Sequence, residues 1–409
     1  MARRPPSREV PPTAGLPPRW RDLLPAPGTP SDLAAGLADL LGADQVQLEC
    51  SGTAALVVAL TTLRQRTARS RVIVPAYTCP LVALAVRHCG LEPVPCDLAG
   101  GSIDLDPVML ERLCDRDTLA VLPTHLGGRV ADVGAALAIA RGAGAWVIED
   151  AAQALGARTG GRTVGLAGDA GFFSLAVGKG LTTFEGGALV AADPDLAASF
   201  AETSRDLVPG RAGWEARRSL ELLGYHALYR PALLGLSYGL PLRRALRRGD
   251  PVRAVGDEFP SRIPLHTLGA WRRAVGARAL QRLPAFLAAA EARAAARVER
   301  LNRLDGVNVL VDRPGATGTW PFLWVRMPGQ AARDRALQRL WGAGLGVSRL
   351  FIHALPDYRY LRGLVPPAEV PQARRLAATT LTVSNSPWLD DAAFDRICTE
   401  IGRAAAGNG

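Results

Sequence analysis

Between residues 45 and 148, short apolar runs alternate with segments in which apolar side chains recur every three or four positions. The short runs predict buried strands, at 45–49, 72–74, 93–96, 119–122 and 145–148. The periodic segments predict helices, at 54–63, 81–88, 107–113 and 133–140. The alternation predicts an α/β fold in which a mostly parallel central sheet is flanked by helices. Ligands of such sheets bind beyond the carboxyl ends of the strands.

The chain is long enough for two domains, because 409 residues exceed the size at which a single core usually stops growing. We expect a large domain at 31–262, followed by a connecting helix and a smaller α/β domain at 263–409. Residues 1–30 are rich in proline and arginine and predict an extended arm. The C-terminal part shows helical and strand-like patterns, with helices at 268–304, 333–341 and 391–405 and strands at 307–311 and 322–326.

Residues 205–262 interrupt the alternation with arginine pairs, prolines and a patch of leucine and tyrosine. Glu221 and Arg230 break the apolar run, so we do not expect a transmembrane span. We favour a helical insertion that packs on the body of the protein or on a partner subunit. The less favoured alternative is a membrane-surface patch in which arginines face anionic lipid, namely Arg243, Arg244, Arg247 and Arg248.

The composition, with 48% apolar and 21% charged residues, is that of a soluble globular protein. A formal charge of +10 favours anionic partners such as phosphates and nucleotides. No basic run is interleaved with aromatic residues, so we expect a phosphorylated small molecule and no nucleic acid. The six cysteines have neither metal-ligand nor disulfide-framework spacing, and the N-terminus does not resemble a signal peptide. We therefore predict a cytoplasmic protein without a metal site.

Lys179 is the only lysine in the chain, and every other basic residue counted in the formal charge is an arginine. An arginine stays protonated and forms no imine, whereas a partly desolvated lysine amine can lose its proton and attack a carbonyl. GC-rich codon usage explains why lysine is rare. It does not explain why the remaining lysine lies between Gly178 and Gly180, after an apolar strand-like run. We therefore predict a covalent role for Lys179.

Two further motifs indicate what Lys179 acts on. The Ser-Gly-Thr sequence at 51–53 begins a helix, where free backbone N–H groups and hydroxyls can hold a phosphate, although this sequence is also a common helix cap. Asp150 ends a predicted strand, and a buried aspartate needs a cationic partner such as a pyridinium nitrogen; the alternative is an acid that caps the next helix. Together, a phosphate cradle, a strand-end aspartate and an isolated lysine are the parts needed to hold pyridoxal phosphate (PLP).

Four motifs, in matching order and spacing, resemble the DegT/StrS sugar aminotransferases, a group of PLP-dependent enzymes of fold type I, like aspartate aminotransferase. They lie at 51–56, 72–78, 149–154 and 173–187, and the resemblance extends over roughly residues 30–400. It implies a PLP-dependent transferase fold with a smaller C-terminal domain. It also implies a homodimer with the cofactor at the subunit interface.

Carried over residue by residue, the resemblance assigns Lys179 to the Schiff base with the cofactor and Asp150 to the pyridine nitrogen. It places Gln153 near the ring hydroxyl or the ring face. It assigns the cofactor phosphate to Gly52, Thr53 and Ser174.

The chain also departs from the family pattern. Arg262 resembles the position from which the neighbouring subunit reaches toward the phosphate, but prolines replace the usual residues around it. Where many members place an aromatic ring against the cofactor, this chain has Cys79. Either Tyr77 stacks on the ring instead, or the ring face is packed differently. His125 and His353 lie near the expected site, and the sequence leaves open whether they are structural.

The resemblance implies that an amino donor, glutamate in this family, gives its amino group to a keto acceptor in two half-reactions. Lys179 would be the base, so we expect its pKa to lie below the ordinary value of about 10.4. Lysine stands where related dehydratases carry histidine, which favours transamination over deoxygenation. Our leading hypothesis is an aminotransferase acting on the keto group of a nucleotide-linked sugar. The alternatives are a non-sugar keto or cyclic substrate, and a catalytically silent PLP-fold binding protein.

Overall fold

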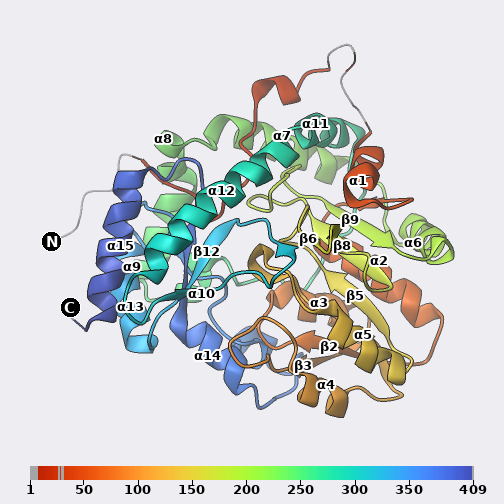
Figure 1. The fold of residues 1–409 in the computed structure, drawn as a ribbon. Helices are drawn as coiled ribbons and strands as arrows, with labels where there is room; N and C mark the ends of the chain where they lie inside the picture. Colours follow the sequence, from red (N-terminus) through yellow and green to blue (C-terminus); the bar gives the residue numbers. More distant parts are fainter. Residues whose placement is uncertain (1–7, 26–27, 29–31, 408–409) are drawn as a thin grey trace.

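A seven-stranded sheet forms the centre of the larger part of the protein (Figure 1). The computed structural model describes residues 8–25, 28 and 32–407. The sheet has the strand order β1 (Gln47–Glu49), β9 (Gly187–Ala191), β8 (Ala170–Ser174), β5 (Trp146–Asp150), β4 (Thr118–Val121), β2 (Arg71–Pro75) and β3 (Glu92–Cys96). From β3 to β8 the neighbouring strands are parallel, whereas β9 is antiparallel to both β8 and β1. The predicted α/β fold with its mostly parallel sheet is confirmed.

Helices cover both faces of this sheet, because successive residues of a strand point to opposite sides. In β2, Val72 and Val74 join the apolar cluster on one face, with α2 (Gly52–Gln65), α3 (Pro80–His88) and α6 (Pro194–Leu207). Ile73, which lies between them, joins the cluster on the other face, with α4 (Pro107–Leu113) and α5 (Val133–Gly142). The strands and helices predicted between residues 45 and 148 are all present, with ends within two residues of those expected.

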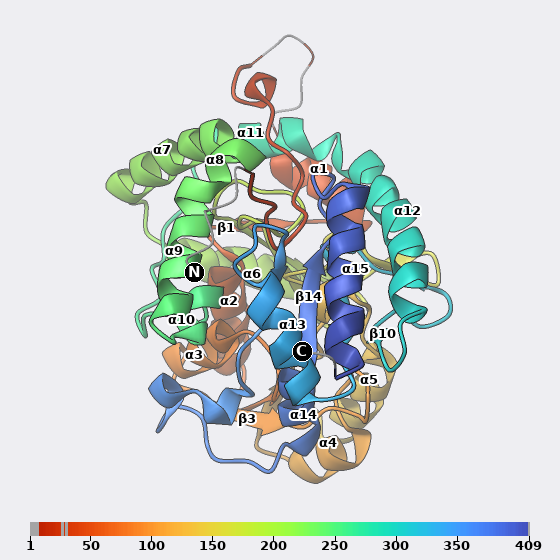
Figure 2. The ribbon, with the colours of Figure 1, turned by 90° about the vertical axis from the view of Figure 1, so that its left-hand side faces the viewer.

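A second sheet lies in the C-terminal part of the chain and is antiparallel. Its strand order is β10 (Asn308–Val309), β12 (Phe322–Arg326), β14 (Thr380–Ser384) and β13 (Val347–Ser348). Its apolar residues form one core with α12 (Leu283–Asn302), α13 (Gln330–Leu340) and α15 (Asp391–Ala405). Figure 2 shows these three helices around β14. We propose a division of the chain near residue 262, with one sheet on each side.

The predicted single helix at 268–304 is wrong, because the structure has two helices there: α11 (Ala270–Leu280) and α12. Pro284 lies in the first turn of α12, where its missing N–H costs nothing. A continuous helix would place Pro284 in the interior, where it would lose a hydrogen bond and clash with the preceding turn. The apolar periodicity continues across the break, and for this reason the pattern alone did not reveal it.

Other elements are short or connect the two sheets. A three-stranded sheet contains β11 (Ala316–Thr317), β6 (Arg158–Thr159) and β7 (Arg162–Thr163). The remaining helices and 3-10 turns are α1 (Leu33–Leu41), α14 (Pro371–Thr379), η1 (Trp20–Asp22), η2 (Leu126–Gly128), η4 (Leu355–Asp357) and η5 (Arg359–Leu361).

The interruption of the alternation after α6 is helical. It contains α7 (Ala212–Leu228), α8 (Pro231–Leu234), the π-helical turn η3 (Gly235–Gly239), α9 (Leu240–Arg247) and α10 (Pro251–Val255). In Figure 2 these helices stand together on the left-hand side. Within the described ranges, no helix combines the length and the hydropathy that crossing a bilayer requires.

The described part of the N-terminal arm is hydrogen-bonded to the body and, apart from the 3-10 turn η1, has no helix. Val10 forms an isolated parallel bridge with Leu345, and the N–H of Leu16 donates to the carbonyl of Gly180 at 2.8 Å. The arm therefore runs beside the loop that carries Lys179. The rest of the predicted arm, at 1–7, 26–27 and 29–30, lies outside the described residues.

Candidate active site

A cavity of about 660 Å³ opens at the carboxyl ends of the parallel strands. The strand ends, the Lys179 loop, the N-terminal arm and the segment at 255–264 all contribute to its wall. Seven of the eight site residues predicted from the sequence line it: Gly52, Thr53, Asp150, Gln153, Ser174, Lys179 and Arg262. Residues far apart in the chain thus meet at the place where a parallel sheet binds its ligand.

Tyr77 is the predicted site residue that the structure does not bring to this cavity. Its side chain is fully buried, and its hydroxyl donates to the carbonyl of Phe351 at 3.1 Å. The ring stacks on Trp324 with centroids 6.0 Å apart. Cys79 lines the cavity instead, and burial raises the pKa of its thiol to about 12. At this point the cavity wall therefore carries a small neutral thiol and not the ring of Tyr77.

The start of α2 forms the anion-binding corner of the cavity. The hydroxyl of Ser51 accepts a hydrogen bond from the N–H of Ala54 at 3.0 Å, which leaves the N–H groups of Gly52 and Thr53 without intrahelical partners. A Cβ atom on Gly52 would lie 3.0 Å from the Cβ of Ser174 and 3.3 Å from the carbonyl of Phe173. Glycine therefore lets the helix N-terminus and the end of β8 share one corner, where N–H groups and a hydroxyl can hold a phosphate.

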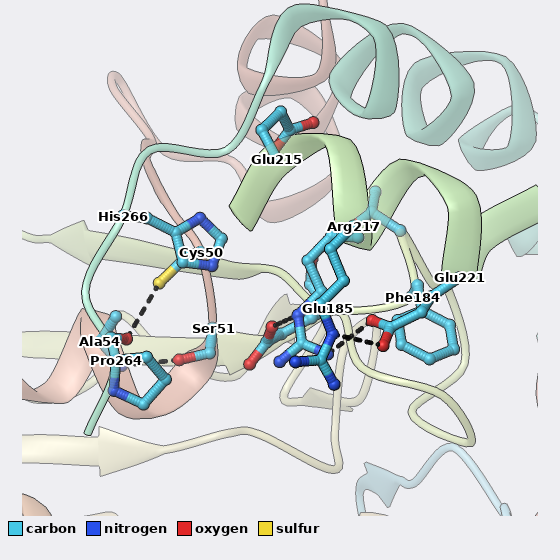
Figure 3. A network of polar contacts seen from close by, with 12 residues as sticks. Cys50, Ser51, Ala54, Phe184, Glu185, Glu215, Arg217, Glu221, Pro264 and His266 are labelled. Atoms are coloured by element: carbon cyan, nitrogen blue, oxygen red, sulfur yellow. Dashed lines mark hydrogen bonds and ion pairs between the residues drawn. The ribbon is translucent and has the colours of Figure 1, made fainter. Parts of the chain in front are cut away.

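Figure 3 shows the polar network beside this corner. The thiol of Cys50 contacts the carbonyl of Pro264 at 3.7 Å, which ties the segment after Arg262 to the start of α2. Arg218, from α7, forms ion pairs with Glu185 and with Glu221. Both Arg218 and Glu185 line the cavity. Sequence reasoning missed Arg218, because no motif marks it and it comes from the interrupting segment.

Asp150 lies at the end of β5 and is 4% exposed. Its Oδ1 accepts a hydrogen bond from the N–H of Ala152 at 3.0 Å, and within the described residues no hydrogen bond reaches Oδ2. Burial raises the pKa of Asp150, although the N–H of Ala152 and the charge of Lys179 oppose this shift. A buried carboxylate with a free oxygen is well suited to accept the N–H of a protonated pyridine ring.

His125 lines the cavity, and both nitrogens of its ring are engaged in hydrogen bonds within the protein. The N–H of Ala131 donates to His125 Nδ1 at 3.1 Å, so the ring proton resides on Nε2 and is donated to Glu149 Oε2 at 2.9 Å. Glu149 also accepts three backbone N–H groups, from Gly165, Ala167 and Gly168. Burial alone would raise the pKa of Glu149, but these hydrogen bonds outweigh it and hold the pKa below its ordinary value.

We expect Glu149→Gln to destabilise the protein by about 3 kcal/mol at neutral pH, because it removes a buried charge from its donors. Because the pKa of Glu149 is lower in the folded than in the unfolded state, its carboxylate stabilises the fold at pH values above the unfolded pKa of about 4.3. This stabilisation is lost as the pH falls from that value through the lower pKa of the folded state. The variant should therefore lose less stability than the wild type on acidification. Urea unfolding across this pH range measures both effects, with the exposed Glu111→Gln as the control. Equal stability of the two variants would contradict this role.

His353 lies outside the lining of the cavity, with its ring edge-on to Tyr358 at a centroid distance of 5.2 Å. It is only partly buried, and burial lowers its pKa. His353 is therefore a neutral side chain at neutral pH that packs beside the site.

Lys179 lies in a tight loop after β8. The glycines on either side adopt positive φ angles, 81° at Gly178 and 84° at Gly180, which other residues rarely adopt. Thr13 of the N-terminal arm closes the loop from outside, because a Cβ on Gly178 would lie 2.3 Å from its hydroxyl. Lys179 keeps partial contact with solvent, but burial in the cavity wall lowers its pKa, against the opposing charge of Asp150. The amine is thus neutral more often than that of a free lysine.

These residues fit PLP. Asp150 is a buried residue whose Oδ2 accepts no hydrogen bond within the described residues. At Gly52, the absence of a side chain keeps the space between the start of α2 and the end of β8 open. The hydroxyl of Thr78 lines the same cavity and has no hydrogen-bond partner among the described residues. The cavity thus offers a phosphate corner, a carboxylate for a ring nitrogen and an amine for a carbonyl carbon.

Residues 29–225 match the model of the DegT/DnrJ/EryC1/StrS aminotransferase family. The erythromycin biosynthesis sensory transduction protein EryC1 of Saccharopolyspora erythraea is 30% identical over 336 residues, which cover 81% of this chain and 78% of EryC1. The GDP-perosamine synthase of Caulobacter vibrioides is 38% identical over 163 residues, which cover 40% of this chain and 44% of the synthase. The solved PLP form of Spr1654 from Streptococcus pneumoniae has the same fold, with a TM-score of 0.73 at 18% identity over 98% of this chain and 100% of Spr1654.

Proposed function

This chain belongs to the DegT/DnrJ/EryC1/StrS aminotransferase family and is a PLP-dependent aminotransferase. We propose that it aminates a keto group of a nucleotide-linked sugar, with glutamate as the donor. The observation that carries this proposal is the meeting of Lys179, Asp150 and the start of α2 in one cavity. The formal charge of +10 favours an anionic acceptor. The relative from Caulobacter, named for a GDP-linked sugar, supports the same class of acceptor.

Each residue of the cavity then has a defined task. When bound, PLP supplies an electrophilic carbon and a ring that accepts electrons. We assign the covalent attachment to Lys179, whose Nζ, once released, moves the proton between carbon atoms. Asp150 holds the proton of the ring nitrogen, and the corner at Gly52 holds the phosphate. Gln153 accepts the N–H of Gly127 at 2.7 Å through Oε1, which leaves its NH₂ group free to donate to the ring.

We also propose that two copies pair at the edge of the cavity that carries Arg262. This residue is exposed and lines the mouth of the cavity, close to Pro264 and the start of α2. An exposed arginine at this point can reach the phosphate site of a second copy, as the family resemblance implies. All six cysteines are free thiols, which suits the cytoplasm as the location.

The proposal is tested by following each half-reaction separately. We expect glutamate to convert the PLP form of the enzyme into its aminated form in the absence of an acceptor, and a keto-sugar nucleotide to restore the PLP form. Mass spectrometry of the acceptor should then show an amine in place of the keto oxygen.

A cyclic or non-sugar keto compound is the second candidate acceptor, because Cys79 leaves space where an aromatic ring is usual in the family. If glutamate converts the enzyme, but only non-nucleotide ketones restore the PLP form, the nucleotide-sugar proposal is wrong and the second candidate holds.

A further inference from the structure

Exposed apolar side chains gather on the helices between residues 212 and 248 and on the neighbouring arm. The described residues include eleven exposed large hydrophobic side chains, and eight of these lie in these two places. Two, Leu220 and Leu236, are 68% and 69% exposed. Two others, Trp20 and Leu24, belong to the arm, where Trp20 packs against His226 of α7 with ring centroids 6.2 Å apart. A concentration of this kind marks a contact surface.

The residues from α8 through η3 to α9 form one continuous helical rod, because the backbone stays helical at both junctions. Leu233, Leu236 and Leu240 are spaced three and four residues apart and are exposed. Continuing the same spacing, Arg244 and Arg247 are also exposed. The opposite side of the rod is buried against the protein, at Leu234, Leu242 and Ala245. The outward face of the rod is therefore apolar at one end and basic at the other.

The charge left unpaired on this surface is positive, because Glu221, the acid next to Leu220, is paired with Arg217 and Arg218. From Leu222 to Gly249 the sequence contains five arginines and neither aspartate nor glutamate. Arg243 is neutralised by the buried Glu9, whose carboxylate accepts its hydrogen bond at 2.8 Å. The other four have no carboxylate within ion-pair distance among the described residues; they are Arg230, Arg244, Arg247 and Arg248.

We propose that this surface docks on an anionic lipid bilayer, with the leucines in the interfacial region and the arginines against the lipid phosphates. We call it the docking surface and define it by the exposed leucines and arginines of residues 220–248. The four arginines without ion-pair partners complement the phosphates of an anionic bilayer, and this charge complementarity favours lipid as the occupant. The leucines lie on short amphipathic helices, so the chain would rest on the bilayer without crossing it.

Docking would bring the active site close to the bilayer. Arg218, Tyr238 and Val255 line the cavity and belong to the same helical segment as the docking surface. The wall of the cavity and the lipid contact are thus parts of one structural unit.

The test is flotation of the full chain with vesicles of equal parts phosphatidylglycerol and phosphatidylcholine, compared with phosphatidylcholine alone. We expect the protein to follow the anionic vesicles at low salt and to be released by high salt, because exposed charges are screened. Replacing Arg244, Arg247 and Arg248 with glutamine should weaken binding roughly a hundredfold. Replacing Leu236 and Leu240 with serine should weaken it roughly tenfold or more.

A matched control variant distinguishes binding through the docking surface from binding through the overall positive charge of the protein. Arg116, Arg362 and Arg396 are exposed elsewhere, and replacing them with glutamine removes the same charge; this variant should bind vesicles within about threefold of the wild type. Circular dichroism and PLP binding establish that each variant is folded. The proposal fails if no protein floats at low salt, or if both arginine triples weaken binding equally. It also fails if the leucine variant dissociates a dimer in sedimentation while vesicle binding is unchanged, because the surface would then be a subunit interface.

Discussion

Lys179→Arg should lower the rate of transamination at least about ten-thousandfold, because an arginine can neither join a carbonyl nor give up its proton. The exchange keeps a positive charge and similar length in the loop, and Gly178 and Gly180 keep their backbone geometry. The measurement is single-turnover conversion of the PLP form by glutamate. Thermal unfolding of the free protein should show little change, which would separate lost chemistry from lost folding.

A second measurement on this variant, the covalent labelling of lysine by PLP, can be interpreted at a single position because of the composition of the chain. Because Lys179 is the only lysine, borohydride reduction in the presence of PLP should fix the cofactor to one internal peptide. The arginine variant contains no lysine side chain, so this labelled peptide should disappear. Labelling of the variant at the N-terminal amine alone would agree with this role for Lys179. Transamination within tenfold of the wild type would contradict it.

Asp150→Asn should lower kcat about a thousandfold, roughly 4 kcal/mol, because an amide cannot keep the ring nitrogen protonated. Attachment of PLP should persist, since Lys179 is unchanged. Burial raises the pKa of Asp150, so its ionised form destabilises the free protein at neutral pH. The variant should therefore unfold in urea at the same concentration as the wild type or at a higher one when PLP is absent.

If Asp150→Asn loses activity but keeps its stability, the carboxylate of Asp150 serves catalysis and not folding. The matched control is Asp117→Asn, because Asp117 is exposed and does not line the cavity. It should leave both activity and stability unchanged. If Asp150→Asn destabilised the free protein by several kcal/mol, Asp150 would instead be a structural acid.

The sequence predicted the parts of the fold that local patterns determine. Strand β2 is an example: its apolar run is short, is followed by the polar Thr78, and packs between helices on both faces. The motif residues around Lys179 and Asp150 were also identified, because glycine spacing and a strand-end acid have physical causes that can be read locally. The break at Pro284 was missed, because a helical pattern continues on both sides of it.

The rest depends on contacts between residues far apart in the chain. Whether Tyr77 faces the cavity or the core is decided by Trp324 and Phe351, which lie more than two hundred positions away. The approach of Thr13 to the Lys179 loop and of Arg218 to Glu185 likewise depends on tertiary packing. No local pattern carries that information.

The measurement that tests the central claim most directly is the near-ultraviolet and visible absorption spectrum of the purified protein with PLP, before and after glutamate. The claim is that Lys179, Asp150 and the start of α2 form one PLP site that accepts an amino group. It predicts a visible band from lysine-bound cofactor that glutamate bleaches, and that Lys179→Arg does not form. A protein that shows no such band with excess PLP, or a band that no amino donor changes, would contradict it.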